Sequence, residues 1–188
     1  GLQLDDKGIP VFDALTMQCG DSPIFIAGDA SNERPLLHEA TDEGRIAGDN
    51  AGRFPDVVAG LRRLPLSIAF TEPQIASLGQ TPRNLEGKHF MTGEVSFGNQ
   101  GRSRVMRQNR GLLRLYGERG TQRLLGAEMV GPRAEHLAHL LAWACQSGMT
   151  VGQMLDMPFY HPVIEEGVRT ALRDLQESLA REVDDLAH

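Results

Sequence analysis

Apolar residues recur every three or four positions along the last part of the chain. The positions are Ile164, Val168, Leu172, Leu175, Leu179, Val183 and Leu186. This period predicts one amphipathic helix that starts shortly after His161-Pro162. The apolar stripe is long and narrow. It suits packing against another helix, including one from a partner chain, as well as it suits the core of its own chain.

Short apolar runs bounded by turn residues occupy the middle of the chain and predict strands. They are Leu66 to Phe70, His89 to Phe97, Leu112 to Tyr116 and Leu124 to Val130, with a hairpin-like break at Gly117 to Thr121 before the last run. Between the first two runs, Glu72 to Gly79 indicates a turn or short helix, and Thr81 to Leu85 indicates another helical start.

Two further helices are predicted after these strands. The first covers Arg133 to Ser147 and ends at Gly148, with one apolar face made of Leu137, Leu140, Leu141, Ala144 and Cys145. The second is short and covers Val151 to Leu155. Clustered strands covered by helices predict an α+β domain built on an antiparallel sheet.

The start of the chain shows a different pattern. Gly8 to Phe12 indicates a short strand, Ile24 to Asp29 a buried parallel strand, and Pro35 to about Arg53 a helix, in which Leu37, Ala40, Gly44 and Ala47 fall at near-helical spacing. A strand, a Gly-Asp turn and a helix start form the place where α/β sheets bind ligands. Asp29 can accept a hydrogen bond from a sugar-like hydroxyl, and the amides near His38 can meet a polar ring edge. A Gly-Asp turn without a ligand explains the same pattern.

Pro and Gly residues mark a boundary between these two parts. We expect residues 1–53 to be the end of an α/β domain and residues 65–188 to form the α+β domain. Residues 54–64 are predicted to be a linker, with Arg62 and Arg63 as solvated charges.

Composition narrows the classes of protein. The 188 residues are 40% hydrophobic and 23% charged, which is typical of a soluble globular protein. The formal net charge of -6 argues against a nucleic-acid groove and an anionic membrane surface. No apolar run approaches the roughly 20 residues that span a bilayer. The chain begins at Gly1 as if inside a longer sequence, so we expect a piece of a larger protein.

Cysteine usage and the absence of a signal peptide favour a cytoplasmic location. Cys19 and Cys145 lie far apart, without the spacing of a metal site or a redox pair. Cys145 falls within a helical apolar pattern and is expected to pack as a small hydrophobic residue.

The candidate chemistry lies at His161-Pro162. Proline restricts the preceding residue to extended geometry and suits the first turn of a helix, so His161 is expected to project from a loop, with Glu166 on the first turns of the helix. A carboxylate that binds one imidazole nitrogen fixes the tautomer and leaves the other nitrogen free to move a proton. A surface His beside an N-terminal helix Glu is the alternative.

Two other clusters carry weaker indications. Arginines 102, 104, 107 and 110 can bind an anion, but in an acidic chain without interleaved aromatic residues they favour an exposed strand edge. His136 and His139 lie three residues apart and have no carboxylate or Cys partner nearby, so they are expected to be surface histidines, and no metal site is predicted.

Five motifs in order resemble the C-terminal part of the pyridine nucleotide–disulfide oxidoreductases, the flavoproteins that include dihydrolipoamide dehydrogenase and glutathione reductase. They are Ile24 to Asp29, Leu37-His38, Phe70 to Gly79, Leu125 to Pro132 and His161 to Glu166. The first two are similar to the second FAD motif and to the helix start that approaches the flavin ring. The third and fourth resemble the entry to the dimerisation domain and the turn before its long helix. The last resembles the His-Pro-Thr-x-x-Glu signature.

The resemblance, nearest dihydrolipoamide dehydrogenase, implies a homodimeric enzyme with FAD, NAD(H) or NADP(H), and a small disulfide or lipoyl substrate. It implies that Gly28, Asp29, Leu37 and His38 contact FAD, and that His161, with Glu166 as its partner, is the acid–base residue presented to the other subunit. The Gly-rich FAD fingerprint, the redox CxxxxC and the nicotinamide domain are missing from this chain. We therefore expect these 188 residues alone to be inactive and to bind flavin weakly or not at all.

Departures from the family pattern are few. Val163 stands where the family usually has Thr, and Pro73-Gln74 replaces Pro-Glu. The helix beyond Gln176 resembles an extension past the usual end of the family. A soluble transhydrogenase or a mercuric reductase-like flavoenzyme is an alternative. So is a dimerisation module without catalysis.

Overall fold

The structure is a computed structural model that describes residues 1–86 and 89–185, with side chains described up to residue 181 in the last helix. The chain divides into two compact units, Gly1–Arg63 and Leu64–His188.

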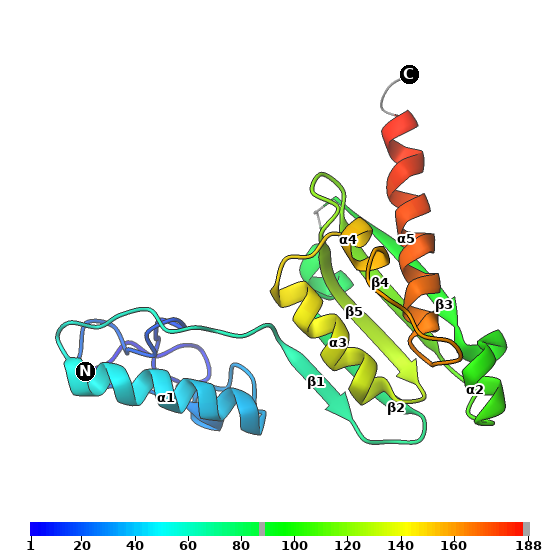
Figure 1. Cartoon of the computed structure of the whole chain (residues 1–188). Helices are drawn as coiled ribbons and strands as arrows, with labels where there is room; N and C mark the ends of the chain where they lie inside the picture. Colours follow the sequence, from blue (N-terminus) through cyan, green and yellow to red (C-terminus); the bar gives the residue numbers. More distant parts are fainter. Residues whose placement is uncertain (87–88, 186–188) are drawn as a thin grey trace. The chain divides into compact units, whose positions relative to one another are not determined.

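The second unit is built on one antiparallel sheet (Figure 1). Its strands are β1 (Leu66–Ala69), β2 (Gln74–Gly79), β3 (Phe90–Ser96), β4 (Leu112–Glu118) and β5 (Leu124–Gly131), in the order β1-β2-β5-β4-β3. All four pairings are antiparallel. A short 3-10 helix, η2 (Pro82–Leu85), follows β2 where the sequence predicted a helical start.

Helices cover this sheet and confirm the predicted α+β class. They are α3 (Ala134–Gln146), α4 (Val151–Leu155) and α5 (Glu166–Asp185). Helix α3 packs on β2 and β5, whereas α5 packs on β3 and β4 (Figure 1). Leu113 and Leu115 of β4 point inward at alternate positions and join the apolar faces of both helices in one hydrophobic core.

The apolar stripe of the last helix packs within its own chain. Val168, Leu172, Leu175 and Leu179 are buried in the core of the second unit, which answers the question that the sequence left open. Side chains beyond residue 181, including that of Val183, are not described, and Leu186 lies outside the described residues.

Gly93 on β3 allows α5 to lie very close to the sheet. A Cβ atom at this position would fall 2.5 Å from Cβ of Leu175 and nearer still to the carbonyl oxygen of Ala171 and the amide nitrogen of Leu175. Since two of these atoms are helix backbone, no side-chain rotation could relieve the overlap. The absence of a side chain is therefore what permits this approach.

Two predictions for the second unit were wrong. Residues 72–79 were expected to form a turn or short helix, but Gln74–Gly79 is strand β2, whose Ala76 and Leu78 point into the core at alternate positions. The arginine cluster was expected at a strand edge, but the 3-10 helix η3 (Phe97–Asn99) and helix α2 (Gly101–Val105) occupy this segment. The side chain of Gln100 accepts a hydrogen bond from the Ser103 amide and so starts α2.

The first unit contains the predicted helix, α1 (Leu37–Arg53), and a 3-10 turn, η1 (Gly28–Ser31). Of the four residues noted at near-helical spacing, Leu37 is 86% exposed and Gly44 is exposed. The buried positions still follow the helical period: Glu39, Asp42, Glu43, Ile46, Ala47 and Asn50. Polar side chains thus form much of this face.

The two strands predicted in the first unit are absent from its described residues. In place of the strand at Gly8 to Phe12 there is one bridge between Leu4 and Pro10. In place of the buried parallel strand at Ile24 to Asp29 there is one antiparallel bridge between Gln18 and Phe25, and Ile24 is exposed. A strand needs a hydrogen-bonding neighbour along its length. Here two backbone hydrogen bonds, from the Cys19 amide to Ile24 and from the Ile26 amide to Met17, flank the Gln18–Phe25 bridge, and the pairing does not extend to Asp29.

The segment 54–63 packs against α1. The side chain of Asn50 donates to the carbonyl oxygens of Thr16 (3.0 Å) and Val58 (2.9 Å) and accepts from the Val58 amide (2.8 Å). Gly60 lies so close to Ile46 that a Cβ atom would overlap its side chain. Arg62 was predicted to be a solvated charge, but its side chain is 11% exposed and forms ion pairs. No helix in the described residues is long and apolar enough to cross a membrane.

Candidate functional site

A histidine and a carboxylate meet at the start of α5. His161 lies in the loop that leads into this helix, and Glu166 is its first residue. Nδ1 of His161 is 3.0 Å from both carboxylate oxygens of Glu166. Because the helix begins at Glu166 and not at Pro162, the five-residue separation is bridged by a turn, which brings the two side chains together.

Several groups hold the Glu166 carboxylate in place. Arg169, one turn further along α5, pairs with Oε1 at 3.0 Å, and the Val163 amide donates to Oε2 at 3.3 Å. The pKa of Glu166 is lowered, mainly by its hydrogen bond to His161, with the Val163 amide and the charge of Arg169 adding to the effect. The carboxylate is therefore ionised at neutral pH.

The loop itself is fixed from two sides. The guanidinium of Arg169 lies 5.5 Å from the ring centroid of Phe159, a cation–π contact. The side chain of Gln100 donates to the carbonyl oxygen of Val163 at 2.8 Å. Sequence reasoning missed Arg169, Phe159 and Gln100. The spacing of Glu166 and Arg169 by three positions on a helix was the available signal.

The imidazole of His161 is presented outward. Its side chain is 81% exposed, whereas that of Glu166 is 18% exposed. Nδ1 faces the carboxylate, and no partner for Nε2 occurs among the residues that the structure describes. This arrangement suits proton transfer at Nε2 with a group outside the second unit.

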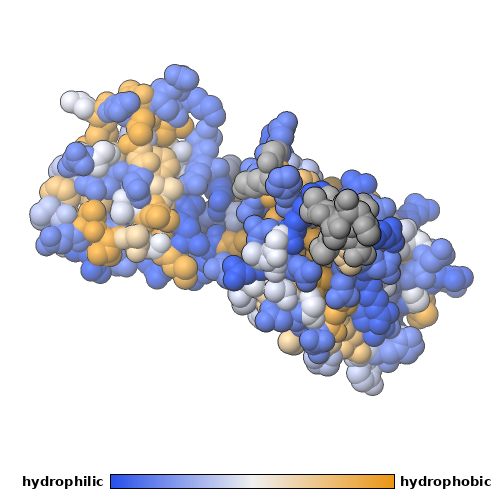
Figure 2. Space-filling view, turned by 90° about the horizontal axis from the view of Figure 1, so that it is seen from above, coloured by the Kyte–Doolittle hydropathy of each residue, from blue (hydrophilic) through white to orange (hydrophobic). Residues whose placement is uncertain are grey.

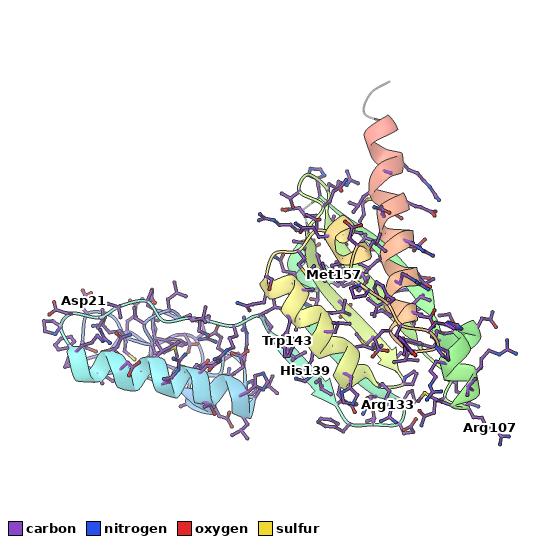
Figure 3. The ribbon with its side chains drawn as sticks, in the orientation of Figure 1. Asp21, Arg107, Arg133, His139, Trp143 and Met157 are labelled. Carbon is purple, nitrogen blue, oxygen red and sulfur yellow. The ribbon has the colours of Figure 1, made fainter. Side chains whose placement is uncertain are left out.

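An apolar groove lies beside the same loop. It has a volume of about 610 Å³ and lies between α3, α4, the loop and the start of α5. Trp143 and Met157, which Figure 3 labels, line it together with Leu140 and Tyr160. All four are large apolar or aromatic residues that are exposed: 72% for Trp143 and 80% for Tyr160. An exposed apolar surface of this kind marks an interaction site.

In the first unit, the predicted flavin-contacting residues lie around one turn. Gly28 has a left-handed φ of 66°, and a Cβ there would lie 3.3 Å from Cβ of Ala40, so this turn packs on the first turns of α1. Asp29 is exposed on η1, and Leu37 and His38 are exposed on the first turn of α1. No side chain caps this helix start. Outward amides beside an exposed carboxylate fit a ligand with hydroxyl and polar ring groups.

Apolar residues also reach the surface of the first unit. Figure 2 shows them gathered on that body. They include Leu4, Val11, Leu15, Ile24, Val58 and Leu61, each at least 45% exposed. The structure thus groups the predicted site residues into two sets, one in each unit.

The remaining candidates show no site. Nε2 of His136 is 3.4 Å from Glu135, and Nδ1 of His139 contacts the carbonyl oxygen of Glu135 at 2.6 Å. No group of metal-ligating side chains occurs among the described residues. Cys145 packs against the core, as predicted, and donates to the carbonyl oxygen of Leu124. Arg107 and its neighbouring arginines are exposed on and after α2, and Figure 3 shows Arg107 pointing away from the fold.

Comparison with known proteins gives the family. Residues 66–172 match the pyridine nucleotide-disulphide oxidoreductase dimerisation domain. The chain is 27% identical over 184 residues to dihydrolipoyl dehydrogenase 3 of Haloarcula marismortui, covering 94% of this chain and 38% of that protein. It is 30% identical over 174 residues to mitochondrial dihydrolipoyl dehydrogenase of Rattus norvegicus, covering 91% of this chain and 33% of that protein.

The fold is also found in solved structures. LpdA of Mycobacterium tuberculosis superposes with a TM-score of 0.77 at 24% identity, over 92% of this chain and 38% of that one. The flavoprotein disulfide reductase RclA of Escherichia coli gives a TM-score of 0.74 at 20% identity, over 94% and 40%. The chain spans between a third and two fifths of the relatives and structures that it matches. It belongs to the pyridine nucleotide-disulphide oxidoreductase family, and residues 66–172 are the dimerisation domain of that family.

Proposed function

We propose that the chain is the C-terminal part of an FAD-dependent dithiol–disulfide oxidoreductase of the dihydrolipoamide dehydrogenase type. In this proposal His161 is the acid–base residue, and Glu166 orients it. The observation that carries the proposal is the pair itself: Nδ1 is held at 3.0 Å from an ionised carboxylate, while the ring is exposed. The outward nitrogen can then exchange a proton with a thiol outside this domain.

The proton chemistry follows from the reactivity of sulfur. A thiolate, and not a thiol, attacks a disulfide. A base that removes the thiol proton generates the nucleophile, and the same group, once protonated, returns the proton to the departing thiolate. Glu166 supports both steps, because its negative charge stabilises the imidazolium and its hydrogen bond fixes which nitrogen carries the reacting proton.

The first unit is proposed to be the end of an FAD domain. Asp29 would accept hydrogen bonds from the ribityl hydroxyls, Gly28 would allow close approach, and the first turn of α1 at Leu37 and His38 would face the flavin ring. FAD supplies hydride and electron transfer when bound, with NAD(P)H as co-substrate. The exposed apolar residues of this unit support the proposal, because a neighbouring part of such a domain would cover them.

The second unit is proposed to form a homodimer, as its family implies. The groove beside the His161 loop, with Leu140 and Trp143 on α3, is the surface that we assign to this contact. A dimer formed there would carry the adjacent imidazole to the partner subunit. This is how a residue with no thiol nearby in its own domain could reach one.

Replacement of His161 by Gln in the full-length protein tests the catalytic role. We expect oxidation of dihydrolipoamide to fall by about 10²–10⁴-fold, the usual contribution of general acid–base catalysis. His139→Gln is the matched control, since it removes another exposed imidazole outside the pair, and its rate should equal that of the parent. An undiminished rate in His161→Gln would refute the role and favour a dimerisation module without catalysis.

The 188-residue chain provides a second test. We expect no turnover of substrate and little or no flavin bound after purification, because the Gly-rich FAD fingerprint and the redox cysteine pair are not in this sequence. Absorbance between 350 and 500 nm measures bound flavin. A stoichiometric amount would contradict the expectation.

A further inference from the structure

Glu43 holds the turn that contains Asp29. Its carboxylate comes from the buried face of α1 and is itself fully buried. Oε2 accepts a hydrogen bond from the Gly28 amide at 2.8 Å. It also lies 3.2 Å from the hydroxyl of Ser31, whose single proton is shared between Oε2 and the carbonyl oxygen of Gly28 at 2.9 Å. These two donors stand on either side of Asp29 in η1. One buried side chain thus fixes the backbone at both ends of this turn.

Arg62 provides the charge that Glu43 needs. One guanidinium nitrogen is 3.1 Å from Oε1 of Glu43 and 3.2 Å from Oε2 of Glu39, and the other is 3.2 Å from Glu33. A buried, ionised carboxylate without a cationic partner would strongly destabilise the folded protein. The two oxygens of Glu43 therefore have separate partners: one faces the turn at Gly28, and the other faces Arg62.

Arg62 is itself held in position by its segment. Residues 54–63 are attached to α1 through the two hydrogen bonds between Asn50 and Val58 and the close packing of Gly60 on Ile46. This segment leads directly to Leu64, where the second unit begins. The residues that precede the dimerisation domain are consequently part of the support of the Gly28–Asp29 turn.

We propose that Glu43 and Arg62 are positioning residues for the flavin. They keep Gly28 and Asp29 in the geometry that presents the Asp29 carboxylate outward, beside the uncapped start of α1. The inference rests on the proposed function, in which this turn contacts FAD. It adds that the strength of flavin binding depends on an ion pair with a residue located just before the dimerisation domain. Neither Glu43 nor Arg62 needs to touch the cofactor.

Flavin titration of the full-length apoprotein tests this dependence. Glu43→Gln keeps the shape of the side chain but replaces one acceptor oxygen with a donor group. Either the Gly28 amide then loses its acceptor, or Arg62 loses one of its three carboxylate partners. We expect the Kd for FAD to rise at least about tenfold, and the visible absorption envelope of the bound flavin to change. Ser31→Ala removes the hydroxyl that contacts Glu43, together with its contacts to the Gly28 carbonyl oxygen and the Glu33 amide, while leaving the ion pair intact. It should raise Kd by a smaller factor, about two- to fivefold.

Arg63→Gln is the matched control. Arg63 neighbours Arg62 in sequence and pairs with Asp42 on the same helix, but it makes no contact with Glu43. Its removal changes the net charge as Arg62→Gln does, yet it should leave Kd and the flavin spectrum unchanged. Arg62→Lys retains the charge and should recover part of the affinity that Arg62→Gln loses.

The outcomes separate the inference from the proposed function. Titrations are made at a temperature where circular dichroism shows every variant to be folded, and Ser31→Ala remains informative if Glu43→Gln does not fold. Equal Kd values and spectra for the parent, Ser31→Ala and the Arg62 variants would overturn the inference alone. A full-length parent protein that binds no flavin would overturn the proposed function, and the inference with it.

Discussion

Replacement of Gly93 by Ala should loosen α5 from the sheet. The new Cβ would lie 2.5 Å from Cβ of Leu175 and even closer to two backbone atoms of α5, whereas ordinary contacts between carbon atoms are about 3.5–4.0 Å. The helix must therefore shift outward by roughly 1 Å, since its backbone cannot rotate out of the way.

The size of the effect follows from the residues that α5 buries. Val168, Leu172 and Leu175 are each essentially inaccessible to solvent, and the burial of each contributes about 2 kcal/mol. A gap of about 0.5–1 Å forfeits a quarter to a half of the packing attraction. We expect the free energy of unfolding of the second unit to fall by about 1.5–3 kcal/mol, the usual range for an overpacked core.

Urea denaturation followed by circular dichroism measures this loss of unfolding free energy. In thermal denaturation of the same two proteins, the Tm should fall by about 5–12 °C. Gly120→Ala is the control, because no heavy atom lies within 4 Å of a Cβ at that position. The reasoning is refuted if Gly93→Ala unfolds within about 0.5 kcal/mol of the parent, the range of an ordinary surface substitution. Such a result would mean that α5 tolerates displacement without loss of packing.

Three further predictions concern single side chains. Because the pKa of Glu166 is lowered, this carboxylate stabilises the fold above the ordinary carboxyl pKa, and the stabilisation is lost as the pH falls through the lowered value. In His161→Gln the pKa of Glu166 should rise, and carboxyl ¹³C NMR measures it. An unchanged pKa would contradict the pairing of His161 with Glu166. Burial raises the pKa of the Cys145 thiol to about 11, so about one molecule in 10⁴ carries the thiolate at pH 7. Alkylation of Cys145 by iodoacetamide should therefore be slow until the protein unfolds. Rapid labelling of the native protein would show that the thiol is accessible. Asn50→Ala removes three hydrogen bonds, two to Val58 in the segment 54–63 and one to Thr16, and should lower the unfolding free energy of the first unit by about 2–3 kcal/mol. An unchanged denaturation midpoint would show that the segment is not anchored there.

The sequence predicted most of the second unit because its signals are local. Short apolar runs bounded by turn residues identified β1, β3, β4 and β5, and the three-to-four spacing identified α3 and α5. Strand β2 was missed, although Ala76 and Leu78 alternate with more exposed residues. The family resemblance placed this segment at the entry to the domain without giving its conformation.

The first unit was predicted less well, since its structure depends on distant residues. Glu39, Asp42 and Glu43 are expected on an exposed face from their charge alone. They are buried because Arg62 and Arg63, at least 19 residues away in sequence, pair with them. No local periodicity reports such a pairing. Local composition likewise predicted a strand at Ile24 to Asp29, but a strand also requires a second segment that forms hydrogen bonds with it along its whole length.

The candidate pair could be predicted because its parts are five residues apart. The proline after His161 indicated the loop, and the carboxylate of Glu166 could only lie nearby. Its supports could not be found in the same way. Gln100 reaches the loop from 63 residues away in sequence, and the stacking of Arg169 on Phe159 depends on how the loop folds back over the helix.

Trp143 gives the molecule an optical reporter of its own assembly state. It is the only tryptophan in the chain, and 72% of it is exposed to solvent on the proposed contact surface. An indole in water emits at longer wavelength than one enclosed by protein. Dilution of a dimer formed through this surface would shift the emission to the red, and the concentration at half of that shift would give the dissociation constant without any added label.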